Sequence, residues 1–167
     1  MITRRHEDGD QRSSAVFSDC LTYRYALTRE WGSGRRIAFV MLNPSTADEQ
    51  RNDPTIERCE RRARRLGFGA MRIVNLFAYR ATDPRDLKRA AAPVGALNDR
   101  MLVEAAQWAD QVLCAWGVHG NHMARDRAVL PLLRENTTEL FHLGLTQAGL
   151  PRHPLYVSYA TVLIPWR

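Results

Sequence analysis

Two asparagines in this chain lie where a polar side chain is unexpected. Asn43-Pro44-Ser45 directly follows the apolar run Ile37–Leu42, and Asn75 lies inside the apolar run Met71–Phe77. A carboxamide can position a water molecule or form paired hydrogen bonds with the edge of a base. Asn43 and Ser45 could equally satisfy backbone groups in a turn that ends a strand. Asn75 must find a hydrogen-bond partner, either in a neighbouring loop or in a cleft that it faces.

The histidines provide a second set of candidates. His153 lies in Pro151-Arg152-His153-Pro154, where the flanking prolines restrict the backbone and orient the imidazole for electrophilic or acid–base chemistry, although a lone loop histidine is often a bystander. His119 and His122 follow the turn at Trp116 and resemble a loop over a helix start, which suits phosphate. No third ligand stands at a usual spacing, so we expect no metal and no other cofactor.

Acidic and basic side chains follow the second apolar run. Arg80 is placed to meet an anion, whereas Asp83-Pro84 is typical of a helix start in which the aspartate caps the first turn. Asp53-Pro54 has the same form. Phosphate-binding glycine loops, the GxGxxG fingerprint, GxSxG and HExxH are all absent, which counts against several large enzyme classes.

These residues must be positioned by an alternating series of strands and helices. Short apolar runs predict strands, and apolar residues at helical spacing predict helices. In chain order the expected strands are Ile37–Leu42, Met71–Phe77, Gln111–Trp116 and Glu139–Leu145. The expected helices are one that Asp53 caps and Gly67 ends, then Gly95–Ala109 and His122–Asn136. Alternation of this kind predicts a three-layer α/β/α sandwich with a short, mostly parallel, four-stranded central sheet. Ligands bind at the carboxyl edge of such sheets, where the polar residues above are expected to gather.

The N-terminal part follows a different pattern. Residues 1–14 are almost wholly polar and predict a flexible arm, whereas Val16–Trp31 is rich in strand formers and predicts a strand or hairpin added to the sheet. Residues 15–167 are then expected to form a single α/β domain.

Composition narrows the functional classes. The 167 residues carry a net charge of +6, and no apolar run reaches the length needed to span a membrane. Three widely separated cysteines do not indicate a disulfide framework, so we expect a reduced, cytoplasmic protein without a membrane partner. The basic balance permits a polyanionic partner, and four arginines, Arg58, Arg61, Arg62 and Arg65, share one face of the helix after Asp53.

Four segments together resemble a known family. MLNPSTADEQRNDPTIERC, VNLFAYRATDP, the AWG turn and GLPRHPLY are similar to the domain-of-unknown-function family 1643. The order of these motifs also resembles the uracil-DNA glycosylase superfamily, and Asn43-Pro44 is most similar to its mismatch-specific branch. The sequence departs from that superfamily at Met41, Ser45 and Leu155, so a changed base, a changed nucleic acid or a free nucleoside remains open.

The resemblance implies specific roles. Asn43 would hold the attacking water, helped by Asp48 or Asp53 as a general base. Pro44 and Ser45 would contact the substrate, and Asn75 would contact the nucleobase. His153 would stabilise the base anion or a phosphate. Phe77 or Tyr79 would stack on the base, and Arg80 and the arginine face would meet phosphates. Trp116, His119 and Arg152 complete the expected binding residues.

The expected function is therefore hydrolysis of an N-glycosidic bond, in nucleic acid, with DNA favoured over RNA, or in a nucleoside-like small molecule. Two alternatives stay open: a non-catalytic nucleic-acid-binding module, and an enzyme acting on a small nucleoside-like or phosphorylated ligand. Salt-dependent binding to nucleic acid and the formation of abasic sites would separate the three.

Overall fold

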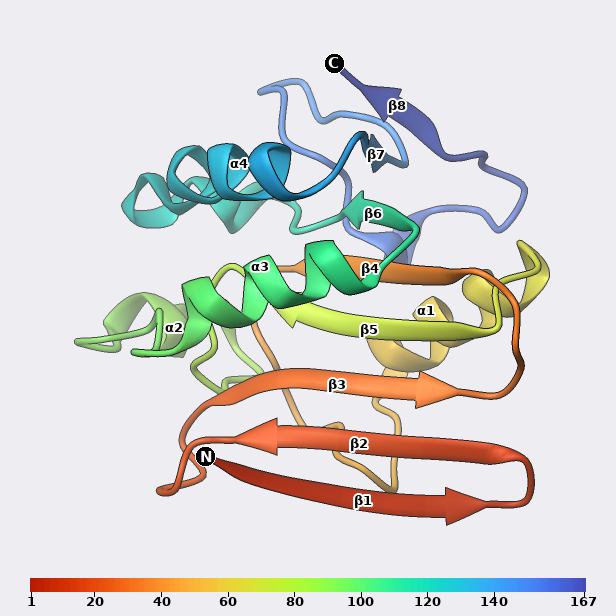
Figure 1. The fold of residues 1–167 in the computed structure, drawn as a ribbon. Coiled ribbons are helices and arrows are strands. Elements are labelled where there is room, and N and C mark those ends of the chain that lie inside the picture. The colour runs from red at the N-terminus through yellow and green to blue at the C-terminus, as the bar shows by residue number, and fades with distance from the viewer.

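The computed structural model describes residues 1–167 and contains one mixed sheet of eight strands (Figure 1). The sheet order is β1-β2-β3-β5-β4-β6-β7-β8. The strands are β1 (Ile2–Asp8), β2 (Gln11–Phe17), β3 (Arg24–Glu30), β4 (Arg36–Met41), β5 (Ala70–Asn75), β6 (Gln111–Cys114), β7 (Leu140–His142) and β8 (Ile164–Trp166). The α/β class expected from the sequence is confirmed.

Four neighbouring strands, β5, β4, β6 and β7, run parallel and correspond to the four predicted from apolar runs. Alternate residues of β4 enter different buried clusters: Ile37 and Phe39 contribute to one, and Ala38 and Val40 to the other. A strand that is buried on both faces needs apolar residues at successive positions, which is why this segment reads as a continuous apolar run.

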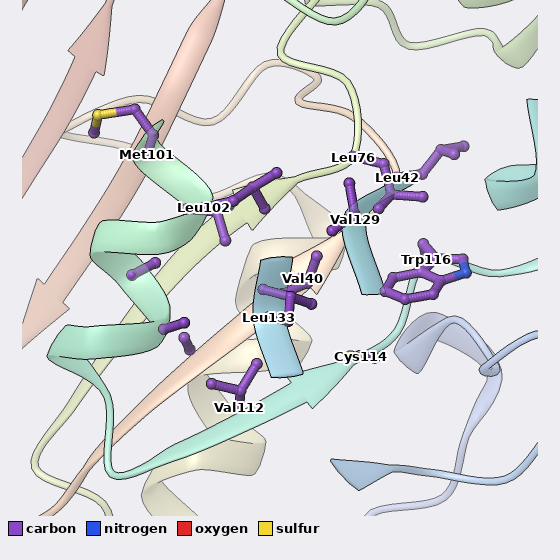
Figure 2. Close-up of a cluster of buried hydrophobic side chains, with 14 of the residues drawn as sticks. Val40, Leu42, Leu76, Met101, Leu102, Val112, Cys114, Trp116, Val129 and Leu133 are labelled. Carbon is purple, nitrogen blue, oxygen red and sulfur yellow. The ribbon is translucent and has the colours of Figure 1, made fainter. Parts of the chain in front are cut away.

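Helices pack against both faces of this sheet. They are α1 (Pro54–Arg65), α2 (Pro84–Arg89), α3 (Asn98–Trp108) and α4 (Arg125–Asn136), with short 3₁₀ helices η1 (Val118–Ala124) and η2 (Pro154–Tyr156). Leu102 of α3 and Leu133 of α4 join one cluster with Val40 (Figure 2), and Cys59 of α1 joins the other. In Figure 1, α3 and α4 lie in front of the sheet and α1 behind it. No helix is both long and apolar enough to span a membrane.

The first predicted helix begins as expected. The carboxylate of Asp53 accepts a hydrogen bond from the backbone N–H of Ile56 at 2.9 Å, and Pro54 occupies the first turn. Asp83 caps α2 in the same way, accepting from Arg85 N–H at 2.8 Å. Both capping predictions are confirmed, and the cap of α1 has a functional consequence because it fixes Asp53 at the carboxyl edge of β4.

The order in which the parallel strands are added to the sheet reverses between β4 and β6. The chain leaves β4 through α1 to reach β5 on one side, then crosses through α3 to reach β6 on the other side of β4. The loops after β4 and β6 therefore diverge toward opposite faces of the sheet. Such a switch point opens a crevice at the carboxyl ends of the two strands, where ligands bind in open α/β sheets.

The sheet has eight strands, against a central sheet of four and an added N-terminal strand or hairpin expected from the sequence. β3 lies within the segment Val16–Trp31 expected to form that addition. The flexible arm expected at residues 1–14 is wrong, because these residues form β1 and most of β2, an antiparallel ribbon that continues through β3 to β5. Backbone hydrogen bonds to β3 hold this ribbon although few of its side chains are buried, and so no apolar pattern marked it. The short strand β8 adds to the opposite edge, antiparallel to β7.

Candidate functional site

A cleft of about 720 Å³ lies at the switch point. It is bounded by the loops that follow β4, β5, β6 and β7, by the start of α1 and by the segment around η2. Its lining residues are Leu42, Asn43, Ser45, Thr46, Asp53, Pro54, Thr55, Ala81, Thr82, Pro84, Trp116, Gly117, Val118, His119, Thr146, Arg152, His153, Leu155 and Tyr156. Two other hollows, of about 510 and 540 Å³, are lined almost wholly by polar side chains and contain none of the candidate residues.

A smaller inner pocket, of about 50 Å³, adjoins this cleft. Asn43, Ser45, Asp53, Thr55 and His153 line both, so the inner pocket lies against the wall of the cleft. Its remaining lining residues are Arg24, Met41, Ile56, Ile73 and Asn75. The structure therefore brings the two asparagines and the histidine singled out from the sequence together around one pocket.

Asn43 has a fixed orientation. Its amide nitrogen donates to the carbonyl oxygens of Ala81 at 2.7 Å and Pro44 at 3.1 Å, with a longer contact to Tyr79 at 3.4 Å. Three carbonyl acceptors on one side decide which end of the carboxamide is nitrogen. The side chain thus ties the loop after β5 to the loop after β4 and leaves Oδ1 as the atom available to a ligand.

Asn75 is the last residue of β5 and is 1% exposed. Neither its side-chain oxygen nor its side-chain nitrogen has a protein partner. Of the two expectations for this residue, pairing with a neighbouring loop is therefore wrong, and the side chain lines the inner pocket. A buried carboxamide with an unpaired donor and an unpaired acceptor is costly unless something in the pocket bonds to it.

His153 is held by its own loop. Its Nδ1 accepts the backbone N–H of Leu155 at 3.2 Å, so the neutral ring carries its proton on Nε2. Burial lowers the pKa of His153, opposed by the nearby Asp53 carboxylate. At neutral pH the side chain is accordingly an uncharged donor at the junction of the cleft and the inner pocket.

The two candidate carboxylates, Asp53 and Asp48, lie in different places. Asp53 lines both the cleft and the inner pocket, and its oxygens accept backbone N–H groups of Ile56 at 2.9 Å and Ala47 at 3.3 Å. Asp48 lines neither. Its Oδ1 accepts from Gln50 N–H at 2.8 Å and Arg51 N–H at 2.9 Å, so it shapes the loop before α1. The expectation that Asp48 acts as a base in the site is wrong.

Several residues expected to bind substrate lie elsewhere. Phe77 is fully buried in the core, 5.5 Å from the His122 ring, and cannot stack on a ligand. Tyr79 packs edge-on against Tyr23, and Arg80 donates to the carbonyl of Leu21 at 3.1 Å. The chain leaves the cleft after Asn75 and returns to it only at Ala81 and Thr82, which the sequence did not indicate.

Two of the four arginines on the arginine face of α1 already donate hydrogen bonds to backbone carbonyls of this chain. Arg58 donates to the carbonyl of Val157 at 2.6 Å, and Arg62, which is 1% exposed, donates to the same carbonyl at 2.8 Å. Both guanidinium groups also lie over the ring of Tyr159. These arginines anchor the segment that carries His153, and the expectation that the whole face meets phosphates is wrong.

Other expected residues do line the cleft: Ser45, Trp116, His119 and Arg152. Burial lowers the pKa of His119, and the charges of Lys88 and His122 lower it further. Pro44 is buried beside the cleft, where its carbonyl accepts from Asn43 and Ala81. His142, expected to pack in the core, is buried and accepts from Gly144 N–H.

Sequence reasoning missed Arg24, the first residue of β3, which lines the inner pocket. It also missed Tyr156, which is 81% exposed at the cleft mouth. The signal for Arg24 was available in part: an arginine among strand formers, at the start of a strand that shares an edge with the carboxyl end of its antiparallel neighbour β5.

A family model for proteins of unknown function, DUF1643, matches residues 24–155. The chain belongs to the DUF1643 family. The matched region begins at Arg24 and ends at Leu155, so it includes every residue that lines the inner pocket. No curated protein and no solved structure matches the chain.

In this DUF1643 protein, the buried Arg62 should be far more important for stability than its exposed neighbour Arg61. We expect Arg62→Met to lower the free energy of unfolding by about 2–4 kcal/mol, because it leaves the Ser158 carbonyl without its donor and the Val157 carbonyl with Arg58 alone. Arg61→Met removes only an exposed pair with Glu57 and should cost about 0.5 kcal/mol or less. Urea denaturation of both variants tests this; equal losses would contradict the anchoring role.

The protein should lose stability as the pH falls below about 6.5. Burial lowers the pKa values of His119, His142 and His153 from their usual 6.5, so in this range the unfolded chain binds more protons than the folded one. Stability is complete above pH 6.5 and falls as the pH drops toward the folded pKa values. Urea denaturation between pH 5 and 8 measures the slope, and His153→Gln should flatten it in part; an unchanged slope would show that His153 is not held neutral.

Proposed function

We propose that the cleft binds a nucleobase-bearing substrate and hydrolyses its N-glycosidic bond. The single observation that carries this proposal is the convergence of Asn43, Asn75 and His153 on one pocket at the carboxyl edge of the sheet. The three residues come from segments 32 or more positions apart in the sequence, counting from Asn43 to Asn75. Helices on both faces of the sheet agree with the three-layer sandwich of the uracil-DNA glycosylase superfamily, and we include that class in the proposal.

Hydrolysis breaks the bond between the sugar anomeric carbon and a base nitrogen. The electron pair leaves with the base as an anion, and the oxocarbenium-like sugar is captured by the oxygen of a water molecule. Catalysis therefore needs an acceptor that orients the water and a donor that meets the charge developing on the base. Asn43 Oδ1 is suited to the first role, and the Nε2–H of neutral His153 to the second.

The remaining polar groups support the same chemistry. Asn75 offers one donor and one acceptor, which suits the carbonyl and N–H pair on a base edge. The Asp53 carboxylate, held by two backbone N–H groups, provides negative charge near the developing sugar cation. Released protons pass to bulk water or to the base. A volume of about 720 Å³ accommodates a nucleoside, and the inner pocket admits only an edge of the base.

The arginine contacts narrow the substrate class. Arg58, Arg62 and Arg80 donate to backbone carbonyls of this chain, so the basic surface free to follow a phosphate backbone is smaller than the net charge suggests. At the cleft itself, Arg152 and His119 remain available for one or two phosphates. We therefore favour a nucleoside, a nucleotide or one flipped nucleotide in DNA over extended binding along a duplex.

The experiment is chromatographic detection of free base after incubation with nucleosides and with oligonucleotides that carry uracil, hypoxanthine or alkylated bases. We expect release with the wild-type protein and a loss of about 100-fold or more in His153→Ala. His6→Ala changes a histidine on β1 outside the cleft and should retain full activity.

Each outcome distinguishes between the open alternatives. Base release that survives both His153→Ala and Asn43→Ala would overturn the assignment of the site. Salt-dependent oligonucleotide binding without release of any base would favour a non-catalytic module instead.

A further inference from the structure

Arg24 is a buried cation without a close counter-ion. It is 1% exposed, and none of the ion pairs of the protein, defined by a nitrogen–oxygen distance of at most 4.0 Å, includes it. Its Nη1 donates to the carbonyl of Ala47 at 2.8 Å, and its Nε has no partner. Burying an unpaired guanidinium costs free energy, so neutralising this charge requires an anion that the chain itself does not place within ion-pair distance.

Arg24 remains charged at neutral pH. Burial lowers its pKa to about 10, with Asp53 opposing that shift and Arg80 and Arg29 adding to it. A pKa of about 10 still leaves the guanidinium protonated near pH 7. The like charges of Arg29 and Arg80 make the surroundings of Arg24 more favourable to an anion.

Two further donors face the same pocket. The carboxamide of Asn75 has no partner for its nitrogen, and His153 is left with a proton on Nε2. Asp53 is the only acidic side chain in the lining, and each of its oxygens already accepts a backbone N–H. The donors available to a ligand in this pocket therefore outnumber the unpaired acceptors that would repel an anion.

The size of the pocket limits the group that enters it. A water molecule needs roughly 10–15 Å³ of such space, so about 50 Å³ corresponds to a few water molecules. A group with three to five heavy atoms, such as a carboxylate or a phosphoryl group, is about this large. A whole nucleobase is too large and can insert only an edge.

We propose that the inner pocket is an oxyanion subsite, in which Arg24 and Asn75 bind a negatively charged oxygen of the ligand held in the outer cleft. The inference deepens the proposed function and rests on it in one respect: for a nucleobase substrate, the oxyanion is the charge that develops on an exocyclic oxygen of the departing base. A permanent carboxylate or phosphoryl group on the ligand would be recognised by the same donors. Acetate and phosphate, used as separate probes, distinguish a planar oxyanion from a phosphoryl group.

Anion binding can be measured without turnover, which separates this inference from glycosidic hydrolysis. Sodium acetate and sodium phosphate are titrated separately into the protein at constant ionic strength, with sodium chloride as the balancing salt, and the melting temperature is followed. We expect a saturable rise in melting temperature with at least one probe. A preference for phosphate indicates a phosphoryl group in the ligand, and a preference for acetate indicates a planar oxyanion.

Variants assign the effect to the pocket. Arg24→Gln should weaken probe binding by about tenfold or more, because a hydrogen bond to a charged group is lost. Asn75→Asp keeps the shape of the side chain but places a carboxylate beside Arg24, so it should abolish binding even if Arg24→Gln fails to fold. Arg5→Gln removes one exposed positive charge on β1 and should leave binding unchanged.

Two results would overturn the inference: no saturable effect of either probe on the wild-type protein, or equal binding in the wild-type and Asn75→Asp proteins. If the probes bind as expected while no base is released from any substrate, the subsite stands and the proposed hydrolysis fails. If base is released but neither probe binds, the subsite fails alone.

Discussion

Replacing Asn43 by aspartate should lower the free energy of unfolding by about 2–3 kcal/mol, although the two side chains have nearly the same shape. The amide nitrogen of Asn43 donates to the carbonyls of Ala81 and Pro44, with a third carbonyl, that of Tyr79, at 3.4 Å. An aspartate would place a carboxylate oxygen against these carbonyl oxygens. Repulsion should detach the loop after β5 from the loop after β4, and urea denaturation at pH 7.5 measures the loss.

Asn43→Ala is the matched comparison for this prediction. It removes the donor without adding a charge, so we expect a smaller loss of about 1–2 kcal/mol. If the aspartate variant were as stable as wild type, the carboxamide would have to be turned the other way, with Oδ1 against the loop and Nδ2 toward the cleft. The proposed role of Asn43 as an acceptor for water would then be wrong.

Gly120→Ala should destabilise the protein by about 3–5 kcal/mol and disturb the cleft directly. A Cβ atom at Gly120 would lie 2.0 Å from Trp116 Cδ1 and 2.6 Å from its Nε1. Trp116 is 1% exposed and lines the cleft, so neither the indole nor η1 can move without opening the core. A lower melting temperature, together with a shift of the Trp116 indole N–H signal in nuclear magnetic resonance spectra, would report the displacement.

Gly32→Ala provides the control for the glycine substitution. A Cβ atom there meets only Gly69 Cα at 3.6 Å, an ordinary contact, and Gly32 has no positive φ. We expect this variant to melt within a few degrees of wild type. Similar losses for the two variants would mean that close packing of Gly120 on Trp116 is not what shapes the cleft.

The parts of the fold that could be predicted are those in which local chemistry and tertiary burial agree. The run from Ile37 to Leu42 is apolar at every position because both faces of β4 are covered, and Asp53-Pro54 has the composition of a helix start. The ribbon of β1 and β2 was missed because it is held by backbone hydrogen bonds, from β1 to β2 and from β2 to β3. The side chains of β1 are mostly exposed. A strand with both faces largely exposed has no need of apolar residues at alternate positions, so the sequence carries no periodic signal for it.

The site was predictable to the extent that parallel strands share a carboxyl edge. That rule alone brings Asn43 and Asn75 together, since Met41 pairs with Asn75 in the register of β4 and β5. Arg24 was missed because β3 is antiparallel to β5, so that its first residue, and not its last, reaches this edge. Phe77 was misplaced because the path of a loop depends on long-range contacts, such as Ala78 N–H to the Val94 carbonyl, that the local sequence does not encode.

The central claim is that Asn43, Asn75 and His153 form the ligand site of this DUF1643 protein. The most direct measurement is nuclear magnetic resonance of the side-chain amide groups of Asn43 and Asn75 and of the His153 ring during titration with a panel of nucleosides and nucleotides. We predict saturable shifts of the Asn75 amide and the His153 ring by at least one ligand, with little change at His6 in the polar groove beside β1. Saturable shifts that cluster around His6, with none at Asn75 or His153, would contradict the claim.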